Sequence, residues 1–123
     1  MTASILVIED DPASLELLKY LLERAGYAVY AASNGAAGLQ AALQNNLDLV
    51  LCDLQMPELT GFEVIARLQA DPRWRNAPIV AVTAYSMPGD CDAALAAGFK
   101  YYMTKPIDPD TFLDEIERFL AAG

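Results

Sequence analysis

Acidic residues and one lysine stand directly after apolar runs of the sequence. The runs cover residues 4–8, 49–52 and 101–104, and the charged residues that follow them are Glu9, Asp10, Asp53 and Lys105. A charge inside a folded core is costly unless it is paired or bound to a metal. In an open parallel sheet, however, the carboxyl ends of the strands are where ligands bind. A group of carboxylates with one ammonium at such ends suits a metal ion and a phosphoryl group.

The elements that must position these residues alternate between strand and helix patterns. Strands are expected at 4–8, 27–32, 47–52, 79–83 and 101–104, and a helical pattern follows each of them. Asp11 before Pro12 has the chemistry of an N-cap and a first helical residue. The near-continuous apolar run at 47–52 is typical of a strand buried on both faces. Five such units predict an α/β fold, a (βα)₅ doubly wound five-stranded parallel sheet.

The order of the strands decides whether the polar residues meet. The flavodoxin-like order 2-1-3-4-5 is common for five units of this kind, and it makes the ends of strands 1, 3, 4 and 5 neighbours. One pocket is then expected to collect Glu9, Asp10, Asp53, Thr83 and Lys105. Close carboxylates repel one another by about 3 kcal/mol per pair at an effective dielectric constant of about 20. They need a cation, and oxygen ligands without Cys or His point to Mg²⁺ or Mn²⁺.

Composition limits the classes of function. The chain has 123 residues, of which 54% are hydrophobic and 20% charged, so one globular domain is expected. No apolar run approaches the roughly 20 residues of a membrane span. The N-terminus lacks the basic start of a secretory signal, and Cys52 and Cys91 have no metal-type spacing. A cytoplasmic protein without membrane contact, disulfide or zinc site is therefore expected.

Charge and the absence of histidine narrow the chemistry further. The net charge of −9 repels phosphate backbones, which argues against direct binding to nucleic acid. The chain contains no histidine, which excludes a Ser-His-Asp triad, a histidine general base and a self-contained phosphohistidine donor. Chemistry here must use carboxylates, a hydroxyl, a lysine, a metal or a side chain of a partner.

Five motifs in order give the chain a family resemblance. They are Ile-Glu-Asp-Asp-Pro at 8–12, Cys-Asp-Leu-Gln-Met-Pro at 52–57, Gly61, Val-Thr-Ala at 82–84 and Thr-Lys-Pro at 104–106. Together they resemble the response-regulator receiver domain, and the resemblance runs from Ser4 to Leu120. Among receivers the chain looks most like stand-alone ones and those fused to hybrid sensor kinases. The resemblance implies two-component signalling by a phosphoprotein.

The resemblance assigns the nucleophile and the metal ligands. Asp53 would attack the phosphoryl group of a phosphohistidine on a partner and become an aspartyl phosphate. Asp10 would bind Mg²⁺ directly, and Glu9, where many receivers carry Asp, would bind through water or as a second acidic ligand. The carboxylate of Asp53 itself and the backbone carbonyl of Gln55 would complete the protein ligands. Asp11 is interpreted as a helix cap.

The resemblance also implies how phosphorylation is sensed. Thr83 would hydrogen-bond one phosphoryl oxygen and Lys105 would pair with another, with a cis peptide before Pro106 that aims the lysine inward. Tyr102 would turn inward as Thr83 moves, which would switch the surface formed by the fourth helix, the fifth strand and the fifth helix. Two further residues would flank the entry of attacking water and tune the phosphate lifetime, namely Gln55 and Tyr85.

Several alternatives remain open from the sequence. Residues 1–123 are expected to be a single receiver without an output domain and not an enzyme in its own right. Its expected partners are a histidine kinase or histidine phosphotransfer protein and a downstream protein target. The chain could instead be a relay intermediate, a receiver cut from a hybrid kinase, or a receiver that signals by dimerisation without phosphorylation. The acids after the first strand would repel the phosphate group of a flavin, which argues against a flavin site. An aspartyl-nucleophile phosphatase would usually have a second acid at the position of Gln55.

Overall fold

Strands and helices alternate along the whole chain in the computed structural model, which describes residues 2–74, 78–84 and 88–122. The strands are β1 (Ser4–Ile8), β2 (Ala28–Ala32), β3 (Leu49–Asp53), β4 (Ile79–Thr83) and β5 (Tyr101–Thr104). The helices are α1 (Pro12–Arg24), α2 (Gly35–Gln44), α3 (Gly61–Gln69), α4 (Pro88–Ala97) and α5 (Pro109–Ala122), with a 3₁₀ helix η1 (Pro72–Trp74) before β4.

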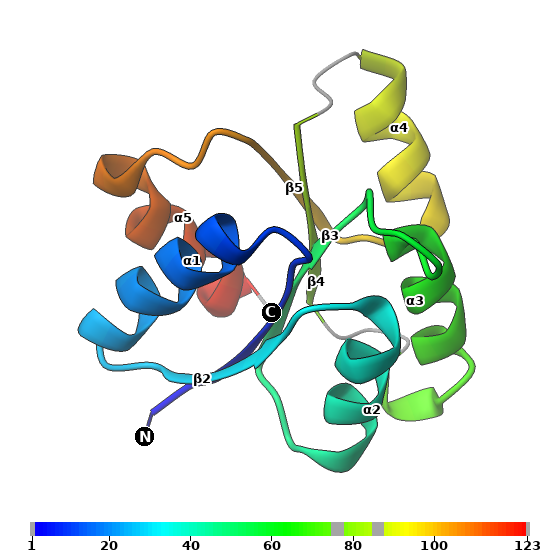
Figure 1. Ribbon diagram of the computed structural model, residues 1–123, viewed down its shortest axis with the longest axis horizontal. Coiled ribbons are helices and arrows are strands. Elements are labelled where there is room, and N and C mark those ends of the chain that lie inside the picture. The colour runs from blue at the N-terminus through cyan, green and yellow to red at the C-terminus, as the bar shows by residue number, and fades with distance from the viewer. Residues whose placement is uncertain (1, 75–77, 85–87, 123) are drawn as a thin grey trace.

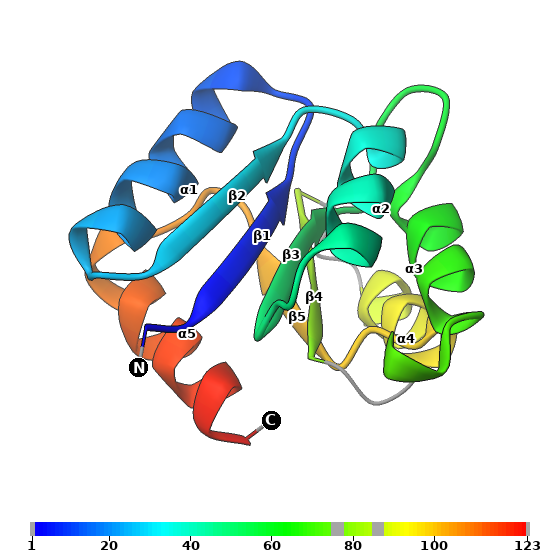
Figure 2. The same cartoon turned by 90° about the horizontal axis from the view of Figure 1, so that it is seen from below.

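All five strands are parallel and form one sheet in the order β2-β1-β3-β4-β5. The predicted fold class and strand order are therefore confirmed. Helices α1 and α5 cover one face of the sheet, and α2, α3 and α4 cover the other (Figure 1). Figure 2 shows the same three layers from below, with the sheet between the two groups of helices. No helix in the described part of the chain is long and apolar enough to cross a membrane.

The core consists of two apolar clusters, one on each face of the sheet. Because side chains alternate along a strand, Leu6 and Ile8 of β1 enter the cluster beneath α2–α4, while Ile5 and Val7 enter the cluster beneath α1 and α5. Every residue of β3 and β4 is buried, as expected for strands covered on both faces. The edge strand β2 is mostly exposed.

Two strand boundaries differ from the sequence prediction. Strand β2 begins at Ala28, because the amide of Tyr27 donates to the Leu22 carbonyl (3.1 Å) at the end of α1. Strand β3 begins at Leu49 and includes Asp53, so Leu47 lies outside the sheet. Tyr27 and Leu47 are half-buried and still pack against the core clusters. Their apolar character therefore indicated core packing and not strand pairing.

Side-chain caps fix the helix starts next to the carboxyl ends of the strands. Asp11 caps α1 and accepts from the backbone amide (3.3 Å) and the hydroxyl (2.8 Å) of Ser14. Thr60 and Glu63 form a reciprocal capping box at the start of α3. Each cap satisfies amides that a helix start leaves unpaired, so the two loops that follow β1 and β3 end at defined places.

Candidate functional site

The buried polar side chains of the described residues gather at the carboxyl edge of the sheet. Glu9 follows β1 and is 1% exposed, Asp53 ends β3 at 5%, and Thr83 ends β4 at 0%. The strand register brings them together, because Ile8 pairs with Cys52 and Asp53 pairs with Val82. The sequence prediction of one pocket at this edge depends on this register.

Three carboxylates lie close together at this edge. Glu9, Asp10 and Asp53 each offer an oxygen, and these oxygens all lie within 4.8 Å of one another. Asp10 is the most exposed of the three. The backbone amide of Gln55 donates to Oδ1 of Asp53 (3.1 Å), and the amide of Asp11 donates to Oε1 of Glu9 (3.3 Å). In both cases, the backbone amide two residues further along the chain holds the carboxylate in place.

Lys105 brings the positive charge to this group. Its Nζ lies 2.9 Å from Glu9, to which it donates a hydrogen bond, and 3.2 Å from Oδ2 of Asp53. Its backbone amide donates to the Thr83 carbonyl (2.8 Å), which joins the loop after β5 to the end of β4. The Lys105–Pro106 peptide bond is cis. The ammonium therefore bridges the two buried carboxylates.

The pKa values reflect burial and crowding. Burial raises the pKa of Glu9 and the charge of Asp53 raises it further, while the hydrogen bond from Lys105 offsets part of the rise. Burial alone would lower the pKa of Lys105, but the hydrogen bond to Glu9 and the charges of both carboxylates outweigh it, so this pKa is raised. Burial also raises the pKa of the Cys52 thiol, which keeps it protonated and unreactive.

The carboxylate group fits a hard divalent cation. Oε2 of Glu9 is buried and accepts no hydrogen bond in the described structure, although the Lys105 ammonium lies close to it. The donors are carboxylate oxygens without sulfur or imidazole, which is the set that Mg²⁺ prefers. The residues present thus suit Mg²⁺ or Mn²⁺.

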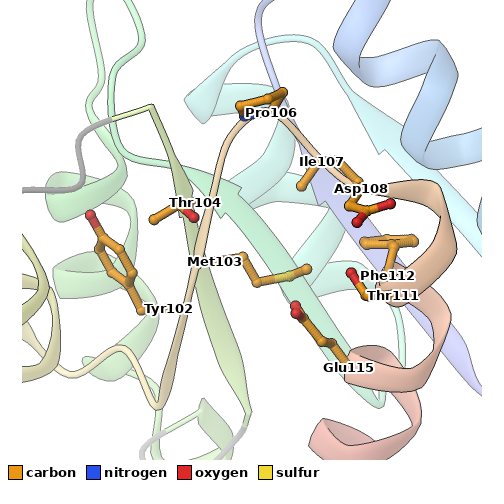
Figure 3. Close-up of a pocket in the computed structure, with 9 residues that line it drawn as sticks. All are labelled: Tyr102, Met103, Thr104, Pro106, Ile107, Asp108, Thr111, Phe112 and Glu115. Atoms are coloured by element: carbon orange, nitrogen blue, oxygen red, sulfur yellow. The ribbon is translucent and has the colours of Figure 1, made fainter.

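The remaining predicted residues lie around this group at different depths. Gln55 is exposed beside Asp53, and Pro106 is exposed after Lys105. Tyr102 on β5 is half-buried against the cluster beneath α2–α4. Figure 3 shows its ring directed to the opposite side of β5 from Met103. Tyr85 lies outside the described residues.

Two cavities lie beside β5 and the loop that follows it. One of about 270 Å³ lies between β5 and the start of α5, and Figure 3 shows the residues that line it, from Tyr102 to Glu115. The other, of about 330 Å³, lies between α1 and the loop after β5 and adjoins Lys105. Its lining is mainly apolar and includes Leu17, Leu18 and Ile107.

Gly61 is a residue to which sequence reasoning gave no physical role. A Cβ atom there would overlap the carbonyl oxygen of Asp53 and lie 2.9 Å from Cα of Leu54. Its amide donates to the Leu54 carbonyl (3.1 Å). The first turn of α3 therefore packs directly on the backbone that carries Asp53. The signal in the sequence is a glycine at the start of a helical pattern, where a better helix former would otherwise be expected.

Comparison with known proteins agrees with this geometry. The family model described as "Response regulator receiver domain" matches residues 5–117. The polar-differentiation response regulator DivK of Brucella ovis is 35% identical over 120 residues, which cover 98% of each chain. The chemotaxis protein CheY4 of Vibrio cholerae has a similar structure, with a TM-score of 0.91 and 27% identity over 97% of this chain and 99% of that one.

A further similar structure is described with a metal in place. It is the receiver domain of a Pseudomonas aeruginosa sensor histidine kinase "with magnesium ion coordinated in the active site cleft". Its TM-score is 0.89 at 27% identity, with 98% of this chain and 99% of that chain covered. The fold, the acidic edge with its bridging lysine and the match over residues 5–117 lead to one conclusion: the chain belongs to the response regulator receiver domain family of two-component signalling.

Proposed function

We propose that Asp53 accepts a phosphoryl group from a phosphohistidine on a partner kinase or phosphotransfer protein, in a reaction that requires Mg²⁺. The observation that carries the proposal is the buried carboxylate pair bridged by one ammonium, at the carboxyl edge of a parallel sheet. Burying these charges raises the free energy of the folded protein unless they are compensated. The site therefore suits a ligand that combines a cation with a phosphoryl group. Family membership supports the same class of reaction.

Each residue has a part in the proposed transfer. An oxygen of Asp53 forms a bond to phosphorus as the bond from phosphorus to the donor's imidazole nitrogen breaks, and the bonding electrons stay with that nitrogen. Lys105 leaves Glu9 and pairs with a phosphoryl oxygen, and the Thr83 hydroxyl donates to another. The carboxylates of Glu9 and Asp10 and the carbonyl of Gln55 would hold Mg²⁺ beside Asp53. The bound ion would neutralise charge on the transferring group.

The approach of the donor is accommodated by the apolar cleft beside Lys105. The cleft of about 330 Å³ opens between α1 and the loop after β5 and is lined partly by Leu17 and Ile107. Leu17 is 39% exposed, so this side of α1 offers apolar surface to a partner. A phosphohistidine on such a partner would be held within reach of Asp53.

In this proposal, the conformational response to phosphorylation passes from Thr83 to β5. An aspartyl phosphate adds negative charge and acceptor oxygens, which attract Thr83 and the segment after it. Tyr102 would then turn inward and change the surface of α4, β5 and α5, where a downstream target would bind. We further propose that the phosphate lifetime depends on Gln55 and Tyr85, which would flank the path of attacking water. If substitution of either residue left the lifetime of the aspartyl phosphate unchanged, this role of Gln55 and Tyr85 would be disproved.

A relay role is the second version of this function. The same Asp53 phosphate could pass to a histidine phosphotransfer protein, as in a receiver cut from a hybrid kinase. A relay intermediate should show fast, reversible transfer to such a protein. A terminal regulator should instead bind a target with an affinity that depends on phosphorylation.

The decisive experiment is intact mass spectrometry after incubation with acetyl phosphate and Mg²⁺. We expect one added phosphoryl group on the natural chain, none on Asp53→Asn and none in EDTA. Asp114→Asn is the matched control, because Asp114 is an exposed aspartate on α5; it should be phosphorylated like the natural chain. An unmodified natural chain, both with acetyl phosphate and with a phosphorylated histidine kinase, would reject the proposal.

A further inference from the structure

Helix α2 packs closely on the end of β1 that carries Glu9 (Figure 2). The contact is made by Gly38, which is buried, and by Ile8, the last residue of β1. A Cβ atom at position 38 would lie 2.5 Å from Cδ1, 2.6 Å from Cγ1 and 2.9 Å from Cγ2 of Ile8. Carbon atoms pack best at about 3.5–4.0 Å. The two residues therefore fit together only because position 38 has no side chain.

Ile8 has little freedom to relieve such a clash. It is 1% exposed, and its branched side chain has a stiff first torsion. All three carbons beyond its Cβ face position 38, so a turn about either torsion leaves at least one of them close. Helix α2 is also confined at its first turn, where a Cβ on Gly35 would lie 2.8 Å from the Leu59 carbonyl oxygen. An added methyl at position 38 must therefore displace the end of β1.

Displacement of Ile8 moves the residue bonded to it, which is Glu9. The backbone amide of Glu9 donates to the Ala32 carbonyl at the end of β2 (3.0 Å), and its carboxylate lies 2.9 Å from the Lys105 ammonium. Both distances are short and both partners belong to other strands or loops. A shift of Ile8 therefore changes the position of the Glu9 carboxylate relative to those of Asp10 and Asp53.

We propose that Gly38 is a positioning residue for the metal site. It leaves room for Ile8, fixes the end of β1 and so sets the place of the Glu9 carboxylate. The proposal rests on the proposed function, because the position of Glu9 matters for Mg²⁺ only if Glu9 is a ligand. Residues that orient metal ligands typically change metal affinity by about 10- to 100-fold when they are replaced.

The test is a double-mutant cycle on the full chain, read by NMR titration with MgCl₂. Gly38→Ala is made in the natural chain and in an Ile8→Ala background, which removes all three close carbons. We expect the added methyl to weaken Mg²⁺ binding about 10-fold in the natural chain and less than about twofold in the Ile8→Ala background. Gly89→Ala on α4 is the matched control, since a Cβ there meets nothing within 4 Å. It should bind Mg²⁺ like the natural chain.

Two outcomes would overturn the proposal. One is unchanged Mg²⁺ affinity of Gly38→Ala, and the other is an equal loss with and without the Ile8→Ala substitution, which would indicate a general structural defect. Should Gly38→Ala alone fail to fold, an Ile8→Val background lacks only Cδ1 and carries a milder clash. The methyl must then weaken binding more in the Ile8→Val background than in the Ile8→Ala background, and equal effects would refute the positioning role.

A second measurement separates this inference from the proposed function. If the natural chain binds no Mg²⁺, the proposed function fails in the first titration. Hydrogen exchange of the Glu9 amide, without metal, still reports whether the end of β1 has moved from Ala32. We expect faster exchange in Gly38→Ala, no change in Gly89→Ala and recovery when Ile8→Ala is added to Gly38→Ala. Unchanged exchange in Gly38→Ala would show that Ile8 does not transmit the clash.

Discussion

The middle of the sheet and its carboxyl edge are equally buried but opposite in chemistry. In β3, Leu51 is 1% exposed and belongs to the apolar cluster beneath α1 and α5, while Asp53, two residues later, is 5% exposed beside a second carboxylate and an ammonium. The middle of the sheet stabilises the fold by about 25 cal/mol for each Å² of apolar surface buried. The edge buries charges, which is unfavourable unless a partner compensates for them.

This difference separates stability from function within one strand. Changes in the middle should lower the free energy of unfolding without altering the site, provided that the protein folds. Changes at the edge should remove function while stability stays the same or rises, because strained or charged sites are commonly less stable than neutral replacements. The predictions below test this separation, beginning with the largest expected effect.

Leu51→Ala is expected to lower the free energy of unfolding by about 3 kcal/mol. The substitution removes buried methyl groups from the cluster beneath α1 and α5 and leaves a cavity. Urea denaturation measures the loss, and the folded variant should still bind Mg²⁺. Leu95→Ala is the control, because Leu95 on α4 is 46% exposed and its replacement should change stability by less than about 0.5 kcal/mol. Similar losses in the two variants would contradict the comparison.

Glu9→Gln is expected to stabilise the metal-free protein at neutral pH. Burial and the Asp53 charge disfavour the ionised form of Glu9, and a neutral amide avoids this cost while Asp53 still pairs with Lys105. The gain should be smaller than the loss in Leu51→Ala. Thermal unfolding with and without Mg²⁺ should show a higher melting temperature without metal and no further rise when it is added. Glu23→Gln, at an exposed glutamate of α1, should change neither value.

The advantage of Glu9→Gln should depend on pH. The pKa of Glu9 in the folded protein lies above the usual 4.5, so below that pH the residue is protonated in both the folded and the unfolded state. As the pH rises, the unfolded state ionises first, and the stability that Glu9 contributes is lost up to its folded pKa. The difference in melting temperature between the variant and the natural chain should therefore grow as the pH rises above about 4.5 and level off above the folded pKa of Glu9. A difference that is constant over this range would show that Glu9 ionisation carries no cost.

The sequence predicted the fold and the pocket because both depend on local pattern and topology. Alternation of strands and helices fixed the sheet, and the strand order brought Glu9, Asp53 and Thr83 to one edge. What the sequence could not show depends on contacts between distant residues. The Lys105 bridge to both carboxylates and the fit of Gly38 to Ile8 each join segments far apart in the chain. Trp74 lies buried in the 3₁₀ helix η1, a short element that the strand and helix patterns of the sequence did not predict.

Asp11→Ala is expected to lower stability modestly, through loss of the helix cap, and to leave Mg²⁺ affinity nearly unchanged. The side chain caps α1 through Ser14, and these hydrogen bonds lower the pKa of Asp11. Asp11 does not belong to the close carboxylate group, whereas its neighbour Asp10 does. Asp10→Ala should show the reverse pattern, with lower Mg²⁺ affinity and little change in unfolding. If Asp11→Ala lost Mg²⁺ affinity, Asp11 would have to be counted as part of the metal site, contrary to this prediction.

Tyr102→Phe is expected to have the smallest effect on stability, within about 0.5 kcal/mol. The ring would stay packed against the cluster beneath α2–α4, and only the hydroxyl would be lost. Burial, together with Asp90 and Cys91 on α4, raises the pKa of this hydroxyl. Phosphorylation should proceed as in the natural chain, because Tyr102 is not part of the carboxylate group.

The effect of Tyr102→Phe should instead appear in the response to phosphorylation. Hydrogen exchange of β5 and α5 amides, before and after treatment with acetyl phosphate and Mg²⁺, measures that response. If Tyr102 couples Thr83 to this surface, the change in exchange should shrink in the variant while the extent of phosphorylation stays equal. Tyr30→Phe on the edge strand β2, where Tyr30 is 40% exposed, serves as the control. A full response in Tyr102→Phe would mean that the backbone after Thr83, and not the tyrosine hydroxyl, carries the signal from the charged edge to the rest of the protein.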